Sequence, residues 1–118
     1  MEIEIPGTDI KKGLDIYEDD LGIYLSVLRS CASHTPAVID KLRKVSAETL
    51  TDYLAALHSV KGTFATIGAE EIRKEAMQLE QIAKKGDLAG LQAGNDAFLK
   101  RVDTLMDNIR SWLKQHDV

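Results

Sequence analysis

The chain has 118 residues, of which 44% are hydrophobic and 29% charged, with eight glycines and two prolines. This length suits one domain spanning residues 1–118, and the composition excludes disordered, collagen-like and low-complexity proteins. The net charge of −4 argues against duplex nucleic acid or an anionic membrane as a partner. The single cysteine, Cys31, excludes an intramolecular disulfide and a cysteine metal cluster, and it fits a reducing compartment.

Targeting signals are not evident in the sequence. No uninterrupted run of about 18 apolar residues is present to span a membrane. The N-terminus is acidic, whereas a signal peptide begins with basic residues. We therefore expect a cytoplasmic protein. We also expect it to be a monomer. Because a short acidic chain leaves little room for a substrate cleft, a partner-binding or relay module is favoured over an enzyme.

Helices rather than strands are predicted at the start of the chain. The nearest strand candidate, residues 3–5, ends at Pro6. Pro6-Gly7 indicates a turn, after which Thr8 or Asp9 can cap a short helix. A second helix is predicted to begin near Asp19-Asp20, because acidic residues suit the positive end of the helix dipole. The apolar positions are Ile10, Leu14 and Tyr17 in the first helix, and Leu21, Tyr24, Leu25 and Leu28 in the second.

Thr35-Pro36 has the form of a new helix start, with a hydroxyl cap followed by proline at the first helical position. The apolar stripe that follows consists of Val38, Ile39, Leu42 and Val45. Whether Pro36 breaks the preceding helix or only kinks it is left open by the sequence.

Three more helices are predicted in the rest of the chain. Ser46 is expected to cap the first of them, and Gly68 to end or bend it. The second is predicted to run from Ala69 to Gly86, where glycine stops it and Lys84-Lys85 compensate the negative end of its dipole. Asp87 is expected to cap the third. Their apolar positions are Leu50, Tyr53, Leu54, Leu57, Val60, Phe64 and Ile67; Ile72, Ala76, Leu79 and Ala83; and Leu91, Phe98, Val102, Leu105, Ile109 and Trp112. Because the connections look short, consecutive helices should be antiparallel neighbours. The predicted fold is all-α: an antiparallel up-and-down four-helix bundle with a short extra N-terminal helix.

His58 is the strongest candidate for chemistry. Successive residues turn by about 100° around a helix, which places His58 about 100° away from the core direction defined by Leu57. The neighbouring positions on that flank are small: Thr51, Ala55, Gly62 and Ala65. A histidine is about three-quarters neutral at pH 7, so a ring nitrogen is available as a nucleophile.

Lys61 and Gly62 complete this motif. Lys61 lies three residues after His58, so its ammonium can emerge beside the imidazole, favour its neutral form and neutralise an attached phosphoryl group. A glycine inside a helix costs about 1 kcal/mol relative to alanine, so Gly62 needs a reason. Close helix packing is one reason, and clearance for a docking partner is the other. The angular position, about 140° from the core direction, favours clearance.

These residues resemble the histidine-containing phosphotransfer (HPt) domain of bacterial multistep phosphorelays. The family motif His-x-x-Lys-Gly appears as His58-Ser59-Val60-Lys61-Gly62 and is followed by Gly68-Ala69. Further similarity lies in Ile5-Pro6-Gly7, Gly13-Leu14, Tyr24-Leu25, Ala76, Leu79-Glu80 and Lys85-Gly86-Asp87. Two positions depart from the family pattern: Val60, where leucine is usual, and Cys31, where a bulky apolar residue is common.

The resemblance implies a function in two-component signal transduction. His58 would accept a phosphoryl group from the aspartyl phosphate of one receiver domain and pass it to another, while Lys61 stabilises the phosphate and Gly62 keeps the docking surface open. The family has no ATP site and no kinase activity of its own. We therefore expect no cofactor on this chain, with Mg²⁺ supplied by the receiver. Response-regulator receiver domains are the expected partners, and a hybrid sensor kinase is a further candidate.

Other readings of the sequence stay open. The chain could be a phosphoacceptor module cut from a hybrid or chemotaxis-type kinase, or a bundle that docks a receiver without transfer. His34 and His116 are expected to be solvated surface residues, and the three histidines lack the spacing of a metal site. Cys31 is expected to be a small apolar filler. We expect Met77, Met106 and Trp112 to lie in the core or at its edge.

Overall fold

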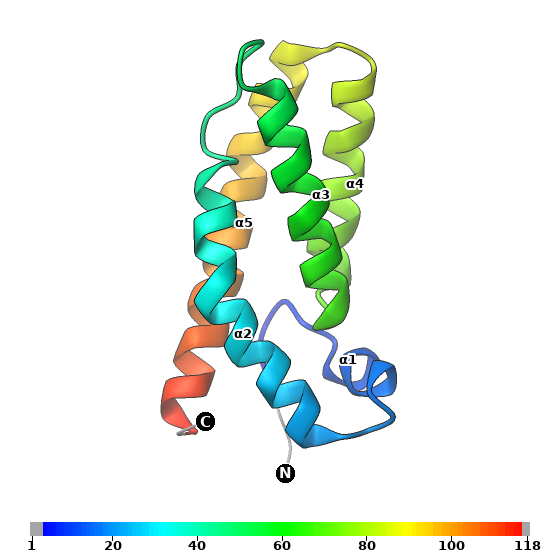
Figure 1. Cartoon of the computed structure of the whole chain (residues 1–118), viewed down its shortest axis with the longest axis vertical. Helices are drawn as coiled ribbons and strands as arrows, with labels where there is room; N and C mark the ends of the chain where they lie inside the picture. The colour runs from blue at the N-terminus through cyan, green and yellow to red at the C-terminus, as the bar shows by residue number, and fades with distance from the viewer. Residues whose placement is uncertain (1–3, 117–118) are drawn as a thin grey trace.

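The fold is a rod of antiparallel helices measuring 46 × 24 × 19 Å. It is seen in a computed structural model that describes residues 4–116. The helices are α1 (Ile10–Ile16), α2 (Leu21–Asp40), α3 (Leu50–Thr66), α4 (Glu70–Lys84) and α5 (Leu88–Gln115). Helices α2 to α5 run alternately up and down, and α1 lies across the end of the rod below α3 (Figure 1). The predicted four-helix bundle with a short N-terminal helix is confirmed.

The two ends of the rod differ. The N-terminal segment and the end of α5 lie at one end, and the connection between α2 and α3 lies at the other (Figure 1). Ile3 of the candidate strand lies outside the described residues, and residues 4–5 are not in a strand. Within residues 4–116, no helix is both long and apolar enough to cross a lipid bilayer.

Aspartates start three of the helices, as the sequence predicts. Asp9, Asp20 and Asp87 accept hydrogen bonds from backbone N–H groups three residues later, at 3.2, 3.1 and 2.8 Å. These bonds satisfy donors that have no partner inside the helix. Of the two candidate caps for α1, Asp9 makes the capping bond, while the Thr8 hydroxyl donates to the Ile5 carbonyl at 2.8 Å.

The predicted new start at Thr35-Pro36 is wrong, because α2 continues through Pro36 to Asp40. Proline lacks the N–H that would bond four residues back, and this bends a helix without always ending it. Figure 1 shows α2 changing direction along its length. Of the two outcomes at Pro36 that the sequence left open, a break and a kink, the structure has the kink, because α2 is bent and continuous.

The stripe after Pro36 is also shorter than predicted. Leu42 is fully buried but lies in the turn after α2, and Val45 lies farther along the connection. Residues 41–49 form a nine-residue connection, which is longer than the short one expected. Ser46 does not cap α3, since the helix begins at Leu50; its hydroxyl instead accepts the N–H of Thr49 at 3.3 Å within this connection.

Gly68 ends α3 and seats α1 against it. Its φ of +79° is a conformation that favours glycine, and a Cβ there would collide with the backbone carbonyl of Asp9. The last carbonyls of α3 have no partner within the helix, so two tyrosine hydroxyls donate to them: Tyr17 to Thr66 and Tyr24 to Ile67, each at 2.9 Å. Burial raises the pKa of Tyr24 to about 12. The lower end of α3 is therefore fixed by contacts with α1 and α2.

Most of the predicted apolar stripes face a common core, and Met106 and Trp112 lie in it. Met77 is an exception, because 43% of its surface is exposed and its sulfur accepts a hydrogen bond from Arg73. Cys31 is buried, as a small apolar filler should be, and burial raises the pKa of its thiol.

Candidate functional site

His58 stands at the middle of α3, on a flank of the bundle. The inner face of α3 is fully buried at Leu57 and Phe64, and this face anchors the helix in the core. The His58 side chain, next to Leu57 in the chain, is 77% exposed. The sequence prediction that the ring reaches solvent is confirmed.

A carboxylate from α4 lies between His58 and Lys61. Glu80 Oε1 accepts a hydrogen bond from Lys61 Nζ at 2.7 Å, and Glu80 Oε2 lies 4.0 Å from His58 Nδ1. The Lys61 and Glu80 side chains are only 25% and 15% exposed, so this pair is screened by water less than an ordinary surface pair. The ammonium of Lys61 thus emerges near the imidazole, but it is held by Glu80 rather than free.

Glu80 distinguishes the two ring nitrogens of His58. At 4.0 Å this contact is too long for a hydrogen bond, but the negative charge of a carboxylate still favours a proton on the ring nitrogen that faces it. Because Glu80 faces Nδ1, it favours a proton there and leaves the lone pair of Nε2 available to solvent. The arrangement suits a nucleophile that reacts through Nε2.

Glu80 was not predicted as a site residue, although its distance from the turn after α3 is a signal for it. His58 and Glu80 each lie eleven residues from Ala69, at the turn between α3 and α4. Residues equidistant from a tight turn face one another in an antiparallel pair of helices. The tight Gly68-Ala69 turn therefore predicts this pairing, once α3 and α4 are recognised as neighbours.

The flank beside His58 carries small side chains. A Cβ built at Gly62 would meet nothing within 4 Å, so helix packing does not require this glycine. Thr51 and Ala55 are also exposed, whereas Ala65 is partly buried and contributes less open surface than predicted. The flank is thus open along α3 on the turns before His58 and on the turn after it.

A groove of about 510 Å³ runs between α2 and α3 beside this flank. We call it the histidine groove; it is lined by Val27, Ser30, Cys31, His34, Thr35, His58, Ser59, Gly62, Thr63 and Thr66. Ile23, one helical turn before Val27 on α2, leaves 48% of its surface exposed. His34 is exposed as predicted, but its place in this groove was not foreseen.

Metal ligands do not gather at this site. Among residues 4–116, no group of three or more His, Cys, Asp or Glu side chains is placed to hold a metal ion. His116, the third histidine, stacks on Trp112 with ring centroids 4.1 Å apart. The groups that the site brings together are the exposed imidazole of His58 and the charged pair of Lys61 and Glu80 beside it.

The fold and the site define a small helical bundle that presents a histidine on its surface rather than in a cleft. The family model of the Hpt domain matches residues 14–117, nearly the whole chain, and the chain belongs to this family. Hpt domains are phosphotransfer modules of phosphorelays, without kinase activity of their own, and they interact with the receiver domains of response regulators. No curated protein and no solved structure gives a significant match to the chain.

Proposed function

We propose that this chain is a phosphorelay intermediary in which His58 accepts a phosphoryl group from the aspartyl phosphate of one receiver domain and passes it to another. The observation that carries the proposal is the exposure of His58, whose side chain is 77% accessible to solvent. Beside it lies Gly62, where an added Cβ would meet nothing within 4 Å. A nucleophile in this position is reached by another protein rather than by a small substrate in a cleft. The histidine groove and the exposed Ile23 next to it offer that protein a surface to cover.

The transfer step uses the Nε2 lone pair of a neutral imidazole. Nε2 attacks the phosphorus of the aspartyl phosphate, an N–P bond forms, and the O–P bond to the receiver aspartate breaks. The leaving group is the receiver carboxylate, and the proton on Nδ1 stays in place, so the ring becomes positively charged. Such transfers depend mainly on positioning and charge stabilisation. The Mg²⁺ expected for the reaction belongs to the receiver domain.

Lys61 and Glu80 have separate roles in this proposal. Lys61 offers its positive charge to the phosphoryl oxygens, and its position beside the imidazole is maintained by Glu80. Glu80 is a positioning residue, which favours the proton on Nδ1 and compensates the charged ring after transfer. The flank of Gly62, Ala55 and Thr51 provides clearance for the docked receiver, and Ala65, which is partly buried, provides less.

The test is incubation with a receiver domain phosphorylated by a small-molecule phosphodonor, followed by detection of acid-labile, base-stable label on this chain. We expect His58→Gln to take up no label. His116→Gln is the matched control, because His116 is an exposed histidine outside the histidine groove; this variant should take up label normally. If His58→Gln were labelled like the parent, His58 would not be the acceptor. If the parent itself took up no label from any receiver of its organism, the relay function would be wrong.

Two further variants separate the supporting roles. Lys61→Ala should slow transfer about tenfold or more while the bundle stays folded. Glu80→Gln should shift the neutral tautomer of His58 away from Nδ1–H, which imidazole ¹⁵N chemical shifts report directly. An unchanged tautomer ratio would remove Glu80 from its positioning role, and unchanged transfer rates would remove Lys61 from the mechanism.

A further inference from the structure

The connection between α2 and α3 is long, yet α5 holds it in place. The carbonyl of Leu42 accepts a hydrogen bond from the buried amide of Asn95, and the carbonyl of Val45 accepts one from Gln92, both at 2.8 Å. Bonds from a neighbouring helix restrict the backbone of this connection and so reduce the backbone entropy that it loses on binding. The side chains of residues 41–49 are therefore presented from a prearranged backbone.

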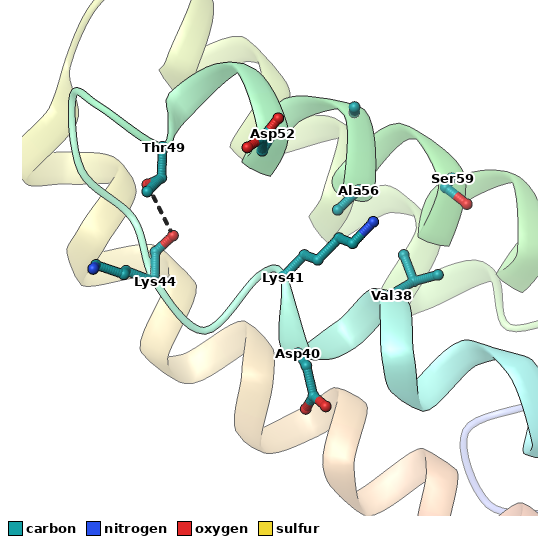
Figure 2. Close-up of a pocket in the computed structure, with 9 residues that line it drawn as sticks. Val38, Asp40, Lys41, Lys44, Thr49, Asp52, Ala56 and Ser59 are labelled. Carbon is teal, nitrogen blue, oxygen red and sulfur yellow. Dashed lines mark hydrogen bonds between the residues drawn. The ribbon is translucent and has the colours of Figure 1, made fainter.

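A second groove, of about 440 Å³, opens between this connection and the first half of α3. We call it the loop groove; its lining comprises Val38, Asp40, Lys41, Lys44, Thr49, Asp52, Ala55, Ala56 and Ser59 (Figure 2). The Lys41 side chain extends over the groove, with its ammonium toward Val38 and Ala56 (Figure 2). Within the described residues, neither Lys41 nor Lys44 forms an ion pair within 4 Å.

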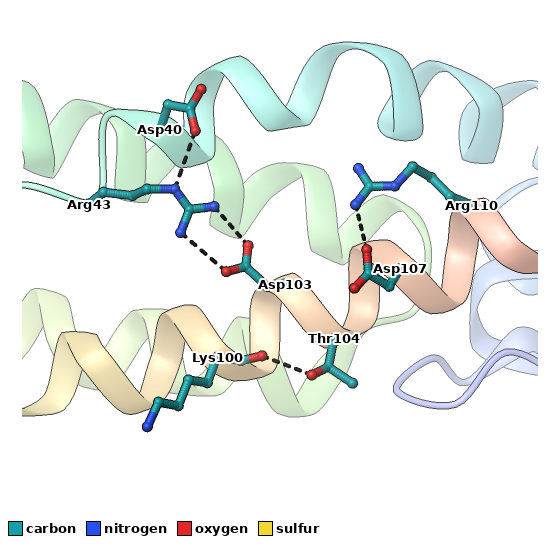
Figure 3. Close-up of polar contacts among 7 residues, drawn as sticks. All are labelled: Asp40, Arg43, Lys100, Asp103, Thr104, Asp107 and Arg110. Atoms are coloured by element: carbon teal, nitrogen blue, oxygen red, sulfur yellow. Dashed lines mark hydrogen bonds and ion pairs between the residues drawn. The ribbon is translucent and has the colours of Figure 1, made fainter.

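Arg43 draws the carboxylate of Asp40, one of the two acidic residues in the lining, away from the groove. Its guanidinium donates to both carboxylate oxygens of Asp103, at 3.1 and 2.8 Å, and to Asp40 at 3.3 Å (Figure 3). The carboxylate of Asp40 consequently turns away from the Lys41 ammonium (Figure 2). The lining carries two lysines and two aspartates, so its formal charge is balanced. With Asp40 turned away and Lys44 pointing out of the groove, Lys41 is the charged residue whose side chain extends over it (Figure 2).

The loop groove is continuous with the flank that surrounds His58. Ser59, the residue after His58, lines both the loop groove and the histidine groove, and Ala55 lies one turn before His58. A protein seated on His58 that spreads along α3 toward the 41–49 connection would therefore cover Lys41. A charge at such a rim acts mainly on the rate of encounter and on the choice of partner, and less on the chemical step.

From this geometry we propose that the loop groove is a specificity element, in which Lys41 binds an acidic side chain of the receiver domain docked at His58. This inference rests on the proposed function. The Lys41 ammonium, which extends over the groove and forms no ion pair among the described residues, is what indicates an acidic group. The continuity with the His58 flank is what indicates the receiver as its source.

The experiment measures steady-state transfer from a phosphorylated receiver domain that labels the wild-type chain. Losing one exposed charge contact costs up to about 1 kcal/mol, equivalent to about fivefold in affinity. We expect Lys41→Gln to raise the KM for the receiver about threefold and Lys41→Glu about tenfold, with kcat unchanged. The wild-type KM should rise with salt, and that of Lys41→Gln should rise less steeply. Lys41→Arg keeps the charge and should behave as wild type.

The matched control is Lys100→Glu, which makes the same charge change at an exposed position on α5 (Figure 3). Equal KM increases in Lys41→Glu and Lys100→Glu would indicate net charge alone and overturn the proposal. So would an unchanged KM in Lys41→Glu, or a fall in kcat without a change in KM. If the wild-type chain accepts no phosphate, the relay function fails first and this inference fails with it; that result appears before any lysine variant is compared.

Discussion

Substitution of Gly62 distinguishes docking clearance from helix packing by the sign of the stability change. Alanine is about 1 kcal/mol more favourable than glycine inside a helix. Because a Cβ at Gly62 meets nothing within 4 Å, no steric cost offsets this gain. Gly62→Ala should therefore stabilise the protein by about 1 kcal/mol, which corresponds to about 4 °C in Tm for a chain of this size. Thermal unfolding followed by circular dichroism measures the shift.

Gly62→Glu addresses the docking surface itself. The longer side chain should fold without difficulty, but it places bulk and negative charge beside His58, where a phosphoryl group and a receiver must approach. We expect transfer at least about tenfold slower than in the parent. Ala97→Glu, which adds the same side chain at an exposed position on α5, should transfer normally. A lower Tm for Gly62→Ala would refute the reasoning in favour of packing, and equal transfer by Gly62→Glu and Ala97→Glu would refute the docking role of this flank.

Three further predictions concern the scaffold of the site. Gly68→Ala should destabilise the protein by about 2 kcal/mol or more and so lower its Tm, because it combines a positive φ with a collision against the backbone at the start of α1. A melt like the parent's would contradict the account of how α1 is seated. Tyr53→Phe leaves the buried Asn95 carbonyl without its 2.8 Å donor and should cost about 1–3 kcal/mol in urea unfolding, whereas a cost near zero would show that the bond contributes nothing. The Arg43 hydrogen bonds hold the pKa of Asp103 below its usual value, so their stabilisation is present above the unfolded pKa of that carboxyl and is lost as pH falls through the folded one. Arg43→Gln should thus cost less than about 1 kcal/mol at pH 7, since both side chains are nearly half exposed, and the difference should vanish in acid; a difference that persisted there would contradict the ion pair as its source.

The fold was largely predictable because apolar spacing and aspartate caps are local signals. The errors arose where distant residues decide the outcome. The sequence around Leu42 continues a helical stripe, but a side chain from α5 bonds its carbonyl and stabilises a turn instead. Pro36 cannot be assigned to a break or a bend locally, since the packing of α2 against its neighbours compensates the missing hydrogen bond. Met77 follows Ala76 directly, so the period of α4 already placed it off the buried face.

The candidate site was predictable in part for the same reason. His58, Lys61 and Gly62 lie within two helical turns, so angular arithmetic places them without tertiary information. Glu80 comes from the next helix, and its role depends on a register that only the tight turn between the helices fixes. The place of His34 depends on how α2 packs against α3, which one sequence does not encode locally.

The arrangement of the chain ends has a practical consequence for constructing fusions. The first described residues and the last turn of α5 leave the rod at the same pole, remote from the 41–49 connection (Figure 1). A fluorescent tag, an affinity handle or a neighbouring catalytic module could be joined at either end without shielding the middle of α3. The histidine would remain accessible to visiting proteins whichever way such a tether was attached.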